Sequence, residues 1–386
     1  MISPQEIQWP DVDFNKLRVN RKQRVVDFLH LNKIDTVILT SPENIRYATD
    51  VRCQLTPERG WFALVLNIDG ISEFFVPYTD DTTSNPYPDF PDVKFMHPSP
   101  AWAVDSMHPQ TWTKILISTL NRMGSKVVGI EGLSPNVIES LQSSGYQTRS
   151  IDREMISIRR NKFAEEIELL VAINEVNSRA CEAAIDAGLR GARDYDFLAA
   201  AIDFQFRAGV EFLSHAVSNV RKQSGDWFPC GTELVSGDAF MFDIGCYGKG
   251  GYASDLARVG FVDEPNKLVS KAYKTLLEAH FIGEEFAKAG VKASEVDAVV
   301  NRHLNERGLP TTPYAMGHGI GLRVCEAPTI NRSSMMDADE VLKVGDVIAL
   351  EPETSVEING IDVVLKVEDN YVVEKDGLKK LSNARY

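Results

Sequence analysis

The sequence lacks the cysteine pattern of a disulfide framework or of a structural zinc site. Its five cysteines are odd in number, lie scattered along 386 residues and show no paired CxxC spacing. This pattern suits reduced thiols better than cross-links or thiolate ligands. The cysteines are Cys53, Cys181, Cys230, Cys246 and Cys325.

Long apolar runs and an excess of basic residues are also missing. The opening stretch MISPQEIQWPDVDF has no basic flank followed by an apolar segment, as a signal peptide would, and no run approaches the length of a membrane span. The chain has 41 Lys and Arg against 55 Asp and Glu, a net charge of −14. This balance argues against nucleic acid as a general partner. We therefore expect a cytoplasmic protein that binds neither nucleic acid nor membranes.

The first part of the chain alternates helix and strand patterns. Apolar residues recur at helical spacing in NKLRVNRKQRVVDFLHLNKI, and DTVILTSP and KVVGIEG are short β-branched runs. A hairpin is expected around Asp69-Gly70, and a long loop between Asp80 and Pro100. Such alternation predicts an α/β domain on a parallel or mixed sheet, over residues 1–156.

The pattern changes near residue 157. A long amphipathic helix is predicted in NKFAEEIELLVAINEVNSRACEAAIDAG, and two further helices follow, separated by strand-rich stretches. In the last helix, Ser294 and Asp297 resemble a capping box and Gly308 a stop. We therefore predict an α+β domain over residues 157–386.

The segment EPETSVEINGIDVVLKVE contains two strand-like runs around an Asn-Gly. Because both residues tolerate the positive φ of a type I′ turn, this dipeptide predicts a two-residue hairpin loop. The loop pairs Ile358 with Ile361, and counting outward brings Glu351 opposite Glu368. Like charges directly opposite each other repel, so a trapped proton or a bound cation must compensate.

A second acidic pair lies in FDIGCYGKGGYASDLAR. If the glycine-rich turn is centred on Lys249, Asp243 and Asp255 also face each other, although a loop of this length leaves room for a bulge. His318 lies between the two hairpins in sequence, flanked by glycines in YAMGHGIGL. One acidic pair could share a proton, but two pairs with an imidazole favour metal: two divalent ions of manganese, iron, cobalt or zinc.

These motifs resemble, in order and approximate spacing, those of the creatinase/prolidase/aminopeptidase P family. The resemblance rests on FDIG…GYASDLAR, GHGIGL, ALEPE and LKVED, and it extends to IDTVILTSPENIRYATD and EEIELLVAINEVN. It implies a pita-bread catalytic domain preceded by a smaller creatinase-like α/β domain, and a homodimer. It also implies that Glu351 shuttles a proton and that Asp255 and Glu368 bridge two metal ions, whose ligands would be Asp243, Asp255, His318, Glu351 and Glu368.

The chain departs from the family's peptidases at several positions. The histidine expected seven residues after His318 is replaced by Cys325, and the stretch KQSGDWFPCGTELVSGD before the first metal Asp contains none. His215 is too early in the sequence to replace it. The two Asp ligands are one residue further apart than usual, and Lys366 stands where an Arg is usual. Because oxyanion stabilisation is worth a few kcal/mol, the loss of both histidines is expected to weaken peptide hydrolysis.

The leading hypothesis from sequence is therefore a dinuclear-metal hydrolase of a C–N bond, an amide or amidine, in a small non-peptide molecule. Ectoine hydrolase and the dimethylsulfoniopropionate lyase are the family branches it resembles most. The first alternative is an Xaa-Pro dipeptidase or aminopeptidase acting on a dipeptide. Further alternatives are a metal-dependent lyase and a non-catalytic pita-bread binding module.

Other residues are weaker candidates for contact with the substrate. Cys325 is expected to be a small pocket-lining thiol rather than a nucleophile, and first-domain residues are expected to reach a neighbouring subunit's site only by family analogy. The substrate candidates are Trp227, Phe228, Tyr314, Arg323 and Cys325, and those in the first domain are Arg52, Arg59 and Trp61.

Overall fold

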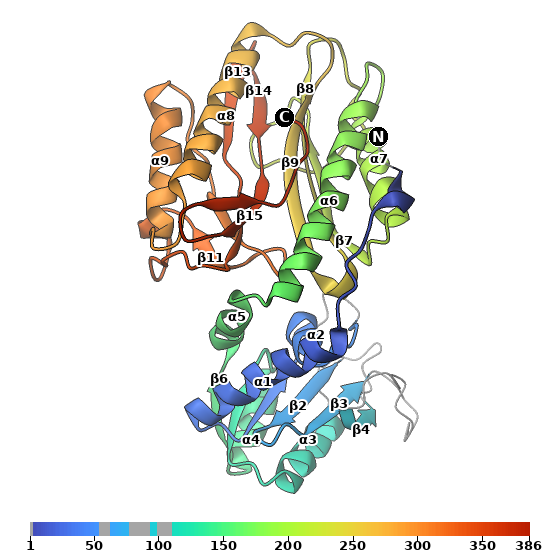
Figure 1. The fold of residues 1–386 in the computed structure, drawn as a ribbon, viewed down its shortest axis with the longest axis vertical. Coiled ribbons are helices and arrows are strands. Elements are labelled where there is room, and N and C mark those ends of the chain that lie inside the picture. Colours follow the sequence, from blue (N-terminus) through green and yellow to red (C-terminus); the bar gives the residue numbers. More distant parts are fainter. Residues whose placement is uncertain (1–2, 54–61, 77–92, 99–109) are drawn as a thin grey trace. The chain divides into compact units, whose positions relative to one another are not determined.

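The computed structural model describes residues 3–53, 62–76, 93–98 and 110–386. These residues form two compact units (Figure 1), one over Val12–Arg159 and a larger one over Arg160–Tyr386 that also includes the chain before Val12. Trp9 explains this inclusion, because its indole N–H donates a hydrogen bond to the carbonyl oxygen of Ala208 at 2.9 Å. Arg59 and Trp61, expected near a partner's site, lie outside the described residues.

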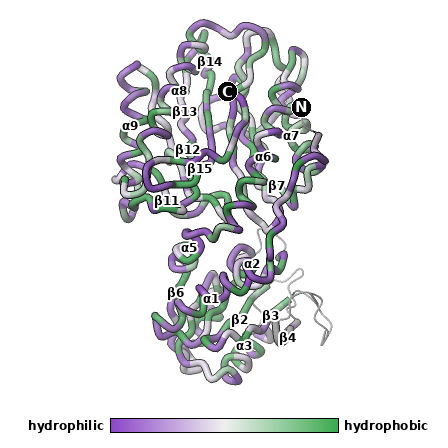
Figure 2. The backbone as a smooth tube through the Cα atoms, in the orientation of Figure 1, coloured by the Kyte–Doolittle hydropathy of each residue, from purple (hydrophilic) through white to green (hydrophobic). Residues whose placement is uncertain are grey.

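The smaller unit is built on a mixed six-stranded sheet with the order β4-β3-β2-β1-β5-β6. Strand β1 pairs antiparallel with β2 and parallel with β5. Trp112, Leu116 and Leu120 of one helix pack against the sheet and are fully buried, which fits the mostly hydrophobic strands in Figure 2. The elements are α1 (Phe14–Asn32), β1 (Thr36–Leu39), α2 (Pro42–Thr49), β2 (Ala63–Asn67), β3 (Ser72–Val76), β4 (Val93–Pro98), α3 (Gln110–Arg122), β5 (Val127–Ile130), α4 (Pro135–Ser143), β6 (Gln147–Ser150) and α5 (Asp152–Arg160).

The predicted hairpin is confirmed, since β2 and β3 pair antiparallel around Gly70, whose φ is +78°. The predicted loop from Asp80 to Pro100 is wrong at Val93–Pro98, which form β4. This strand extends the sheet in parallel along β3, and the ring Nε2 of His97 lies 2.7 Å from Glu73 Oε2 on β3. The surrounding Pro and Asp residues concealed the strand; the rest of the predicted loop lies outside the described residues.

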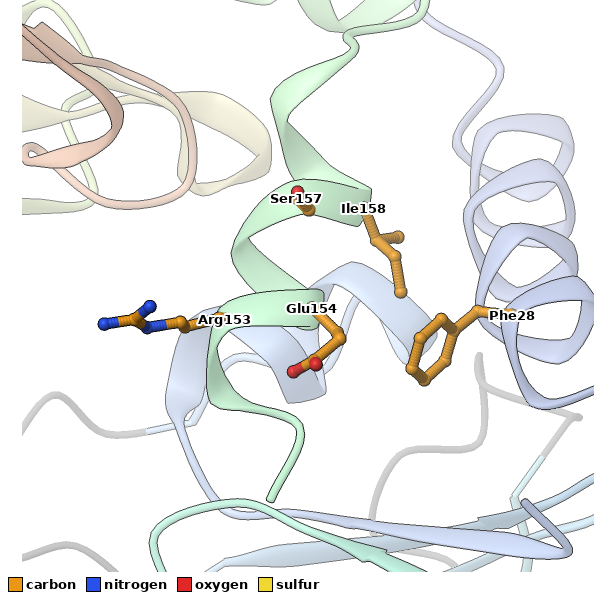
Figure 3. A pocket seen from close by; sticks show the side chains of 5 residues that line it. All are labelled: Phe28, Arg153, Glu154, Ser157 and Ile158. Carbon is orange, nitrogen blue, oxygen red and sulfur yellow. The ribbon is translucent and has the colours of Figure 1, made fainter. Parts of the chain in front are cut away.

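A hollow of about 380 Å³ lies in this unit beside α1 and α5. Figure 3 shows Ile158 of α5 pointing toward Phe28 of α1. The lining includes one carboxylate and no histidine, so it is not a candidate metal centre. It is formed by Phe28, Arg153, Glu154, Ser157 and Ile158.

The larger unit contains a three-stranded sheet, a five-stranded sheet and a two-stranded hairpin, in the orders β7-β8-β9, β11-β10-β12-β15-β16 and β13-β14. Its helices are α6 (Ala164–Ala187), α7 (Asp194–Arg207), α8 (Lys267–Phe286) and α9 (Ala293–Glu306). Its strands are β7 (Phe212–Asn219), β8 (Ala239–Tyr247), β9 (Ala253–Phe261), β10 (Gly317–Gly319), β11 (Glu326–Ile330), β12 (Val347–Leu350), β13 (Glu353–Ile358), β14 (Ile361–Lys366), β15 (Asp369–Val373) and β16 (Leu378–Lys380).

Each helix pair of this unit covers its own strands (Figure 1). Helices α6 and α7 pack on the three-stranded sheet, where Ile173, Phe197 and Phe240 are fully buried. Helices α8 and α9 pack on the strands that follow, around Leu276 and Leu350. The strands in the middle are therefore shielded by helices on the outside, which suits a site made of buried polar groups.

The predicted capping box of the last helix is wrong. Helix α9 begins at Ala293, two residues earlier than a capping box of Ser294 and Asp297 would require. The residue at the third helical position is instead Glu295, whose carboxylate accepts a hydrogen bond from the Lys292 N–H at 3.1 Å. The Ser294 hydroxyl instead donates to Asp339 at 2.7 Å. Gly308 follows the end of the helix with φ +74°, as predicted. In the described part of the chain, every helix is too short or too polar to cross a membrane.

Candidate metal centre

Four carboxylates and one imidazole meet in the larger unit, although they come from two separate sheets. We call the four carboxylates the acid cluster; their residues range from 0 to 8 % exposed. Each lies on or next to a strand: Asp243 on β8, Asp255 on β9, Glu351 after β12 and Glu368 before β15. His318 lies on β10. The structure thus brings all five predicted ligands together.

Backbone contacts hold the two sheets together at this point. The Glu368 N–H donates to the carbonyl oxygen of Ala257 on β9 at 3.0 Å. The side-chain amide of Asn370 donates to the Asp255 carbonyl oxygen at 2.8 Å and accepts from the Asp255 N–H at 3.1 Å. The Glu351 N–H donates to the carbonyl oxygen of Met316 at 2.9 Å, beside His318. The acid cluster is therefore fixed by main-chain geometry.

The predicted register of Glu351 and Glu368 is confirmed by the pairs on either side. Leu350 pairs with Asp369 and Glu353 with Lys366, which is one continuous alignment. The two glutamates occupy the short gap between the ladders. The Asn-Gly loop sets this register, as expected, because it pairs Ile358 with Ile361.

The predicted pairing of Asp243 with Asp255 is wrong by two residues. Asp243 pairs with Ala257, and Asp255 with Gly245. The turn is centred on Gly250, where φ is +79°, rather than on Lys249. Because side chains alternate with a period of two, a shift of two keeps both carboxylates on the same face. They are therefore diagonal neighbours and remain in the acid cluster.

His318 presents one ring nitrogen to three of the carboxylates. Its Nδ1 lies 3.1 Å from the Gly319 carbonyl oxygen, which can only accept, so Nδ1 carries a hydrogen and Nε2 is the nitrogen that would bind a metal ion. Nε2 lies 3.4 Å from Glu351 Oε1, 3.8 Å from Asp255 Oδ2 and 4.0 Å from Glu368 Oε1. Atoms that bind one ion at about 2.1 Å lie roughly 3.0 to 4.2 Å apart, so these spacings fit a shared ion.

The glycines beside His318 are required by close packing, as their position in the sequence suggests. A β-carbon on Gly317 would lie 2.1 Å from the Ala349 carbonyl oxygen, and one on Gly319 would lie 2.0 Å from that of Ala327. Strand β10 therefore fits between β11 and β12 only because both residues flanking His318 are glycines.

Several buried oxygens of the acid cluster accept no hydrogen bond. They are Asp255 Oδ1 and both carboxylate oxygens of Glu368. His215 Nε2 lies 3.1 Å from Asp255 Oδ1 and Lys366 Nζ lies 3.3 Å from Glu368 Oε2, so Glu368 Oε1, 4.0 Å from His318 Nε2, is the least compensated of the three. Leaving a buried charged acceptor unsatisfied costs free energy, which a cation at this position would remove. Among the residues that the structure describes, two groups have ligand atoms close enough to hold an ion. They share Asp255: one is His215, Asp243 and Asp255, and the other is Asp255, His318 and Glu368. The donor set of oxygen and imidazole therefore fits a divalent metal ion.

His215 belongs to the site, although the sequence argument set it aside. Its Nε2 lies 2.9 Å from Asp243 Oδ1 and 3.1 Å from Asp255 Oδ1. It reaches them because β7 pairs antiparallel with β8, placing His215 opposite Gly245 after a bulge. The strand-like alternation of FLSHAVSN was the available indication. A strand neighbour has no fixed distance in sequence, so counting residues from Asp243 missed it.

Lys366 was noted only as a departure, yet its ammonium lies inside the acid cluster. Its Nζ is 2.5 Å from Asp243 Oδ2, 2.9 Å from Glu351 Oε2 and 3.3 Å from Glu368 Oε2. The lysine is 4 % exposed. It therefore supplies one buried positive charge to three carboxylates.

The charges of the site shift each other's pKa values. Burial raises the pKa of Glu368, and the negative charge of Asp255 raises it further, to well above its usual value. Burial works in the same direction on Asp243, but the positive charges of Lys366 and His215 outweigh it and lower that pKa. Burial lowers the pKa of His318, yet contact with Cys325 and the charge of Glu351 raise it well above its usual value. The protein alone therefore favours a proton on Glu368, where a cation would serve instead.

The candidate substrate residues separate into two groups. The Trp227 and Tyr314 rings pack edge to face at 5.5 Å, and Lys366 Nζ lies 6.0 and 5.5 Å from their centres. Arg323 is half-buried and Cys325 is exposed, with the Cys325 thiol beside His318. Phe228 is 79 % exposed, so within this single chain it does not share the packing of its neighbour Trp227.

Glu353 was missed, although it lies two residues after Glu351. It is 1 % exposed and accepts hydrogen bonds from the hydroxyls of Ser224, at 2.5 Å, and Tyr314, at 2.7 Å. The segment that carries Trp227 is thereby tied to strand β13. No sequence spacing could indicate this contact, because Ser224 and Glu353 are 129 residues apart.

Comparison with known proteins assigns the chain to a family. Residues 168–375 match the model of metallopeptidase family M24, and residues 21–159 match the creatinase/prolidase N-terminal domain. The Xaa-Pro dipeptidase of Pyrococcus furiosus is 27% identical over 372 residues, covering 94% of this chain and 97% of that protein. The Xaa-Pro dipeptidase of Pyrococcus horikoshii is 25% identical, covering 93% and 96%.

Solved structures show the same fold. The prolidase from Pyrococcus horikoshii superposes with a TM-score of 0.78 at 22% identity, covering 95% of this chain and 99% of that one. The X-Pro aminopeptidase from Thermotoga maritima gives a TM-score of 0.79 at 19% identity, covering 94% and 98%. The expected fold, a pita-bread domain preceded by a creatinase-like domain, is confirmed, as is the expected class of metal-dependent hydrolase. The chain belongs to metallopeptidase family M24, in the creatinase/prolidase/aminopeptidase P group.

Proposed function

We propose that this chain is a metal-dependent dipeptidase that hydrolyses the amide bond of Xaa-Pro dipeptides. The observation that carries the proposal is the convergence of the acid cluster with His318, where the ligand atoms of Asp255, His318 and Glu368 lie close enough to hold one ion. The relatives named Xaa-Pro dipeptidase, similar over more than nine-tenths of both chains, supply the substrate class. They favour the dipeptide over the small non-peptide substrate that ranked first from sequence.

The residues of the site divide into holding and proton-handling roles. Asp255, His318, Glu351 and Glu368 would hold a divalent ion, with Asp243 and His215 beside them. Bound metal would polarise the amide carbonyl group and lower the pKa of the attacking water. Which metal serves, among manganese, iron, cobalt and zinc, and whether two ions bind, remain predictions.

Glu351 is the proposed proton carrier. Its Oε1 faces His318 and its Oε2 lies 2.9 Å from Lys366 Nζ. A carboxylate held in this way accepts the proton of the attacking water and donates it to the nitrogen of the leaving proline. The Lys366 ammonium, 2.9 Å from Oε2, fixes the orientation of this carboxylate so that Oε1 is directed toward His318.

The walls of the site give proline a matching surface. The Trp227 and Tyr314 rings lie beside Lys366, at the edge of the acid cluster. Aromatic faces bind a pyrrolidine ring by burial of apolar area. The proposed substrate thus places its amide bond next to Glu351.

A second candidate keeps the chemistry and changes the substrate. Cys325, exposed beside His318, occupies the position where the family's peptidases carry a histidine. A thiol is a weak hydrogen-bond donor and stabilises a peptide oxyanion less well than imidazole. This observation favours a small amide or amidine as the alternative substrate of a C–N hydrolase.

Purified protein, stripped of metal and reloaded with Mn²⁺, would distinguish the candidates. We expect turnover of Ala-Pro and Met-Pro, no turnover of Ala-Ala, and loss of at least about 100-fold in kcat in Glu351→Gln. The matched control is Glu357→Gln, an exposed glutamate on the same hairpin. Hydrolysis of cyclic amidines or amide osmolytes without any Xaa-Pro turnover would contradict the dipeptidase proposal and support the second candidate.

A further inference from the structure

The Lys366 ammonium occupies space that a second metal ion would need. It lies within 3.3 Å of one oxygen from each of Asp243, Glu351 and Glu368. A transition-metal ion bridging the same oxygens would lie at about 2.0 to 2.2 Å from them. The ammonium and such an ion therefore exclude each other.

The position of Lys366 is held from several sides. The residue ends strand β14, paired with Glu353, and its side chain is 5 % exposed. The centres of the Tyr314 and Trp227 rings lie 5.5 and 6.0 Å from Nζ. Moving the ammonium away would break three buried ion pairs and leave those carboxylates uncompensated, which is costly.

The ligand atoms that remain suit one ion. Asp255 Oδ2 and Glu368 Oε1 lie 3.8 and 4.0 Å from His318 Nε2, and Glu368 Oε1 is buried and accepts no hydrogen bond. Glu351 Oε1 lies 3.4 Å from His318 Nε2, whereas the other carboxylate oxygen of Glu351, Oε2, faces Lys366. These four residues surround a single position, and none of the oxygens that face His318 is used by the ammonium.

In the second ligand group, the carboxylate of Asp243 is fully engaged. Both oxygens of Asp243 are already engaged, Oδ1 by His215 Nε2 at 2.9 Å and Oδ2 by Lys366 Nζ at 2.5 Å. An ion there would have to displace one of them. His215 and Asp243 therefore form a supporting pair beside Asp255 rather than a complete second site.

We propose that Lys366 replaces one of the two metal ions, so that the chain binds a single tight divalent ion among Asp255, His318, Glu351 and Glu368. The ammonium supplies the positive charge that a second ion would bring to Asp243. This inference depends on the proposed function only in requiring a divalent ion, and its test needs no substrate.

The test is the Mn²⁺ stoichiometry of the full chain. Metal-free protein is loaded with excess Mn²⁺, desalted, and analysed for bound manganese per chain and for the electron paramagnetic resonance spectrum. We expect one ion and an isolated Mn²⁺ spectrum for the wild type and for Lys366→Arg, which keeps the charge. For Lys366→Met we expect two ions and the exchange-coupled spectrum of a metal pair. Lys379→Met, an exposed lysine on β16, is the matched control and should match the wild type.

Two ions in the wild type or in Lys366→Arg would overturn the inference, as would a single ion in a folded Lys366→Met. The melting temperature of Lys366→Met should rise on Mn²⁺ addition by more than that of the wild type, because ions then replace the lost ammonium. A Mn²⁺-induced rise in the melting temperature of Lys366→Met that is equal to or smaller than that of the wild type would also count against the inference. Failure on Xaa-Pro dipeptides with the expected stoichiometry would overturn the proposed function and leave this inference standing.

Discussion

A β-carbon added to Gly245 would lie 2.4 Å from Cε1 of the His215 ring. Glycine at this position of β8 is therefore what allows the imidazole to lie across the strand, and from there it reaches Asp243 and Asp255. The residue that faces Asp255 in the ladder therefore has to lack a side chain, and strand β7 thereby adds His215 to the two aspartates that β8 and β9 supply.

Gly245→Ala is expected to displace His215 and weaken metal binding. Loss of a group that orients the ligands typically costs 10- to 100-fold in metal affinity, so we expect the Mn²⁺ dissociation constant to rise by about 10-fold or more. Isothermal titration calorimetry with Mn²⁺ measures this directly. Gly377→Ala is the control, because no atom lies within 4 Å of its added β-carbon. An unchanged affinity in Gly245→Ala would mean that His215 does not support the metal.

The two hairpins show which parts of the site could be predicted from sequence. Asn359-Gly360 allows one short loop geometry, so the alignment of Glu351 with Glu368 followed by counting. The glycine-rich turn after Tyr247 allows several loop geometries. Its centre lies one residue later than predicted, so Asp243 pairs with Ala257 instead of Asp255. Register can be counted from a tight turn and cannot be counted from a permissive one.

Contacts between separate sheets were beyond prediction for a different reason. His215 and Lys366 reach the acid cluster through strand pairing and side-chain direction, and their distances in sequence from Asp243 carry no information about this. The family, the fold and the identity of the five candidate ligands followed from short motifs. The groups that balance their charge required the structure.

Mn²⁺ is expected to stabilise the protein more as the pH rises. The pKa of Glu368 is raised above its usual 4.5 by burial and by the charge of Asp255. Without metal, the folded state therefore holds a proton that the unfolded chain loses, and stability falls as the pH rises from about 4.5 through the raised pKa. Bound Mn²⁺ favours the ionised carboxylate and removes this loss.

The measurement is the Mn²⁺-induced rise in melting temperature at several pH values. It should increase between pH 5 and 8 in the wild type and be smaller and flatter in Glu368→Gln, which has no carboxyl group to titrate. The control is Glu374→Gln at an exposed position just after β15, and it should behave as the wild type. A rise that shrinks with increasing pH would contradict the assignment.

Asp369, next to Glu368, is expected to be essential for stability. Its Oδ1 lies 2.6 Å from Arg258 Nη2, and both side chains are 0 % exposed. Burial acts to raise the pKa of Asp369, but the charges of Arg258 and its other partners outweigh this and lower it well below 3.8. Asp369→Asn leaves Arg258 buried without its counter-charge, so the free energy of unfolding should fall by about 3 kcal/mol.

Urea unfolding near pH 7 measures this loss, with the exposed Asp376→Asn as control. Because the pKa of Asp369 is lowered in the folded state, its stabilisation is present above pH 3.8 and disappears as the pH falls through the lowered pKa. The difference between wild type and variant should therefore narrow in acid. A loss below about 0.5 kcal/mol at neutral pH would show that the buried pair is not needed.

Trp227 and Phe228 are adjacent in sequence and are expected to respond differently to substitution. Trp227 is half-buried against Tyr314 and borders Lys366, whereas Phe228 is 79 % exposed. Trp227→Ala should lower the free energy of unfolding by about 1 to 3 kcal/mol and raise the KM for Xaa-Pro dipeptides, because it removes packed apolar area beside the site. Phe228→Ala should change the free energy of unfolding by less than about 0.5 kcal/mol.

Equilibrium unfolding and steady-state kinetics on both variants separate the two contributions. Tyr314→Phe is the companion variant, since it keeps the ring but loses the hydrogen bond to Glu353 Oε2 at 2.7 Å. It should raise KM less than Trp227→Ala does if the ring surface binds the substrate. If Phe228→Ala raised KM as much as Trp227→Ala does, Phe228 would contact the substrate, as the sequence suggested. Because Phe228 is exposed in the single chain, it would then have to close over the site when substrate or a second subunit binds.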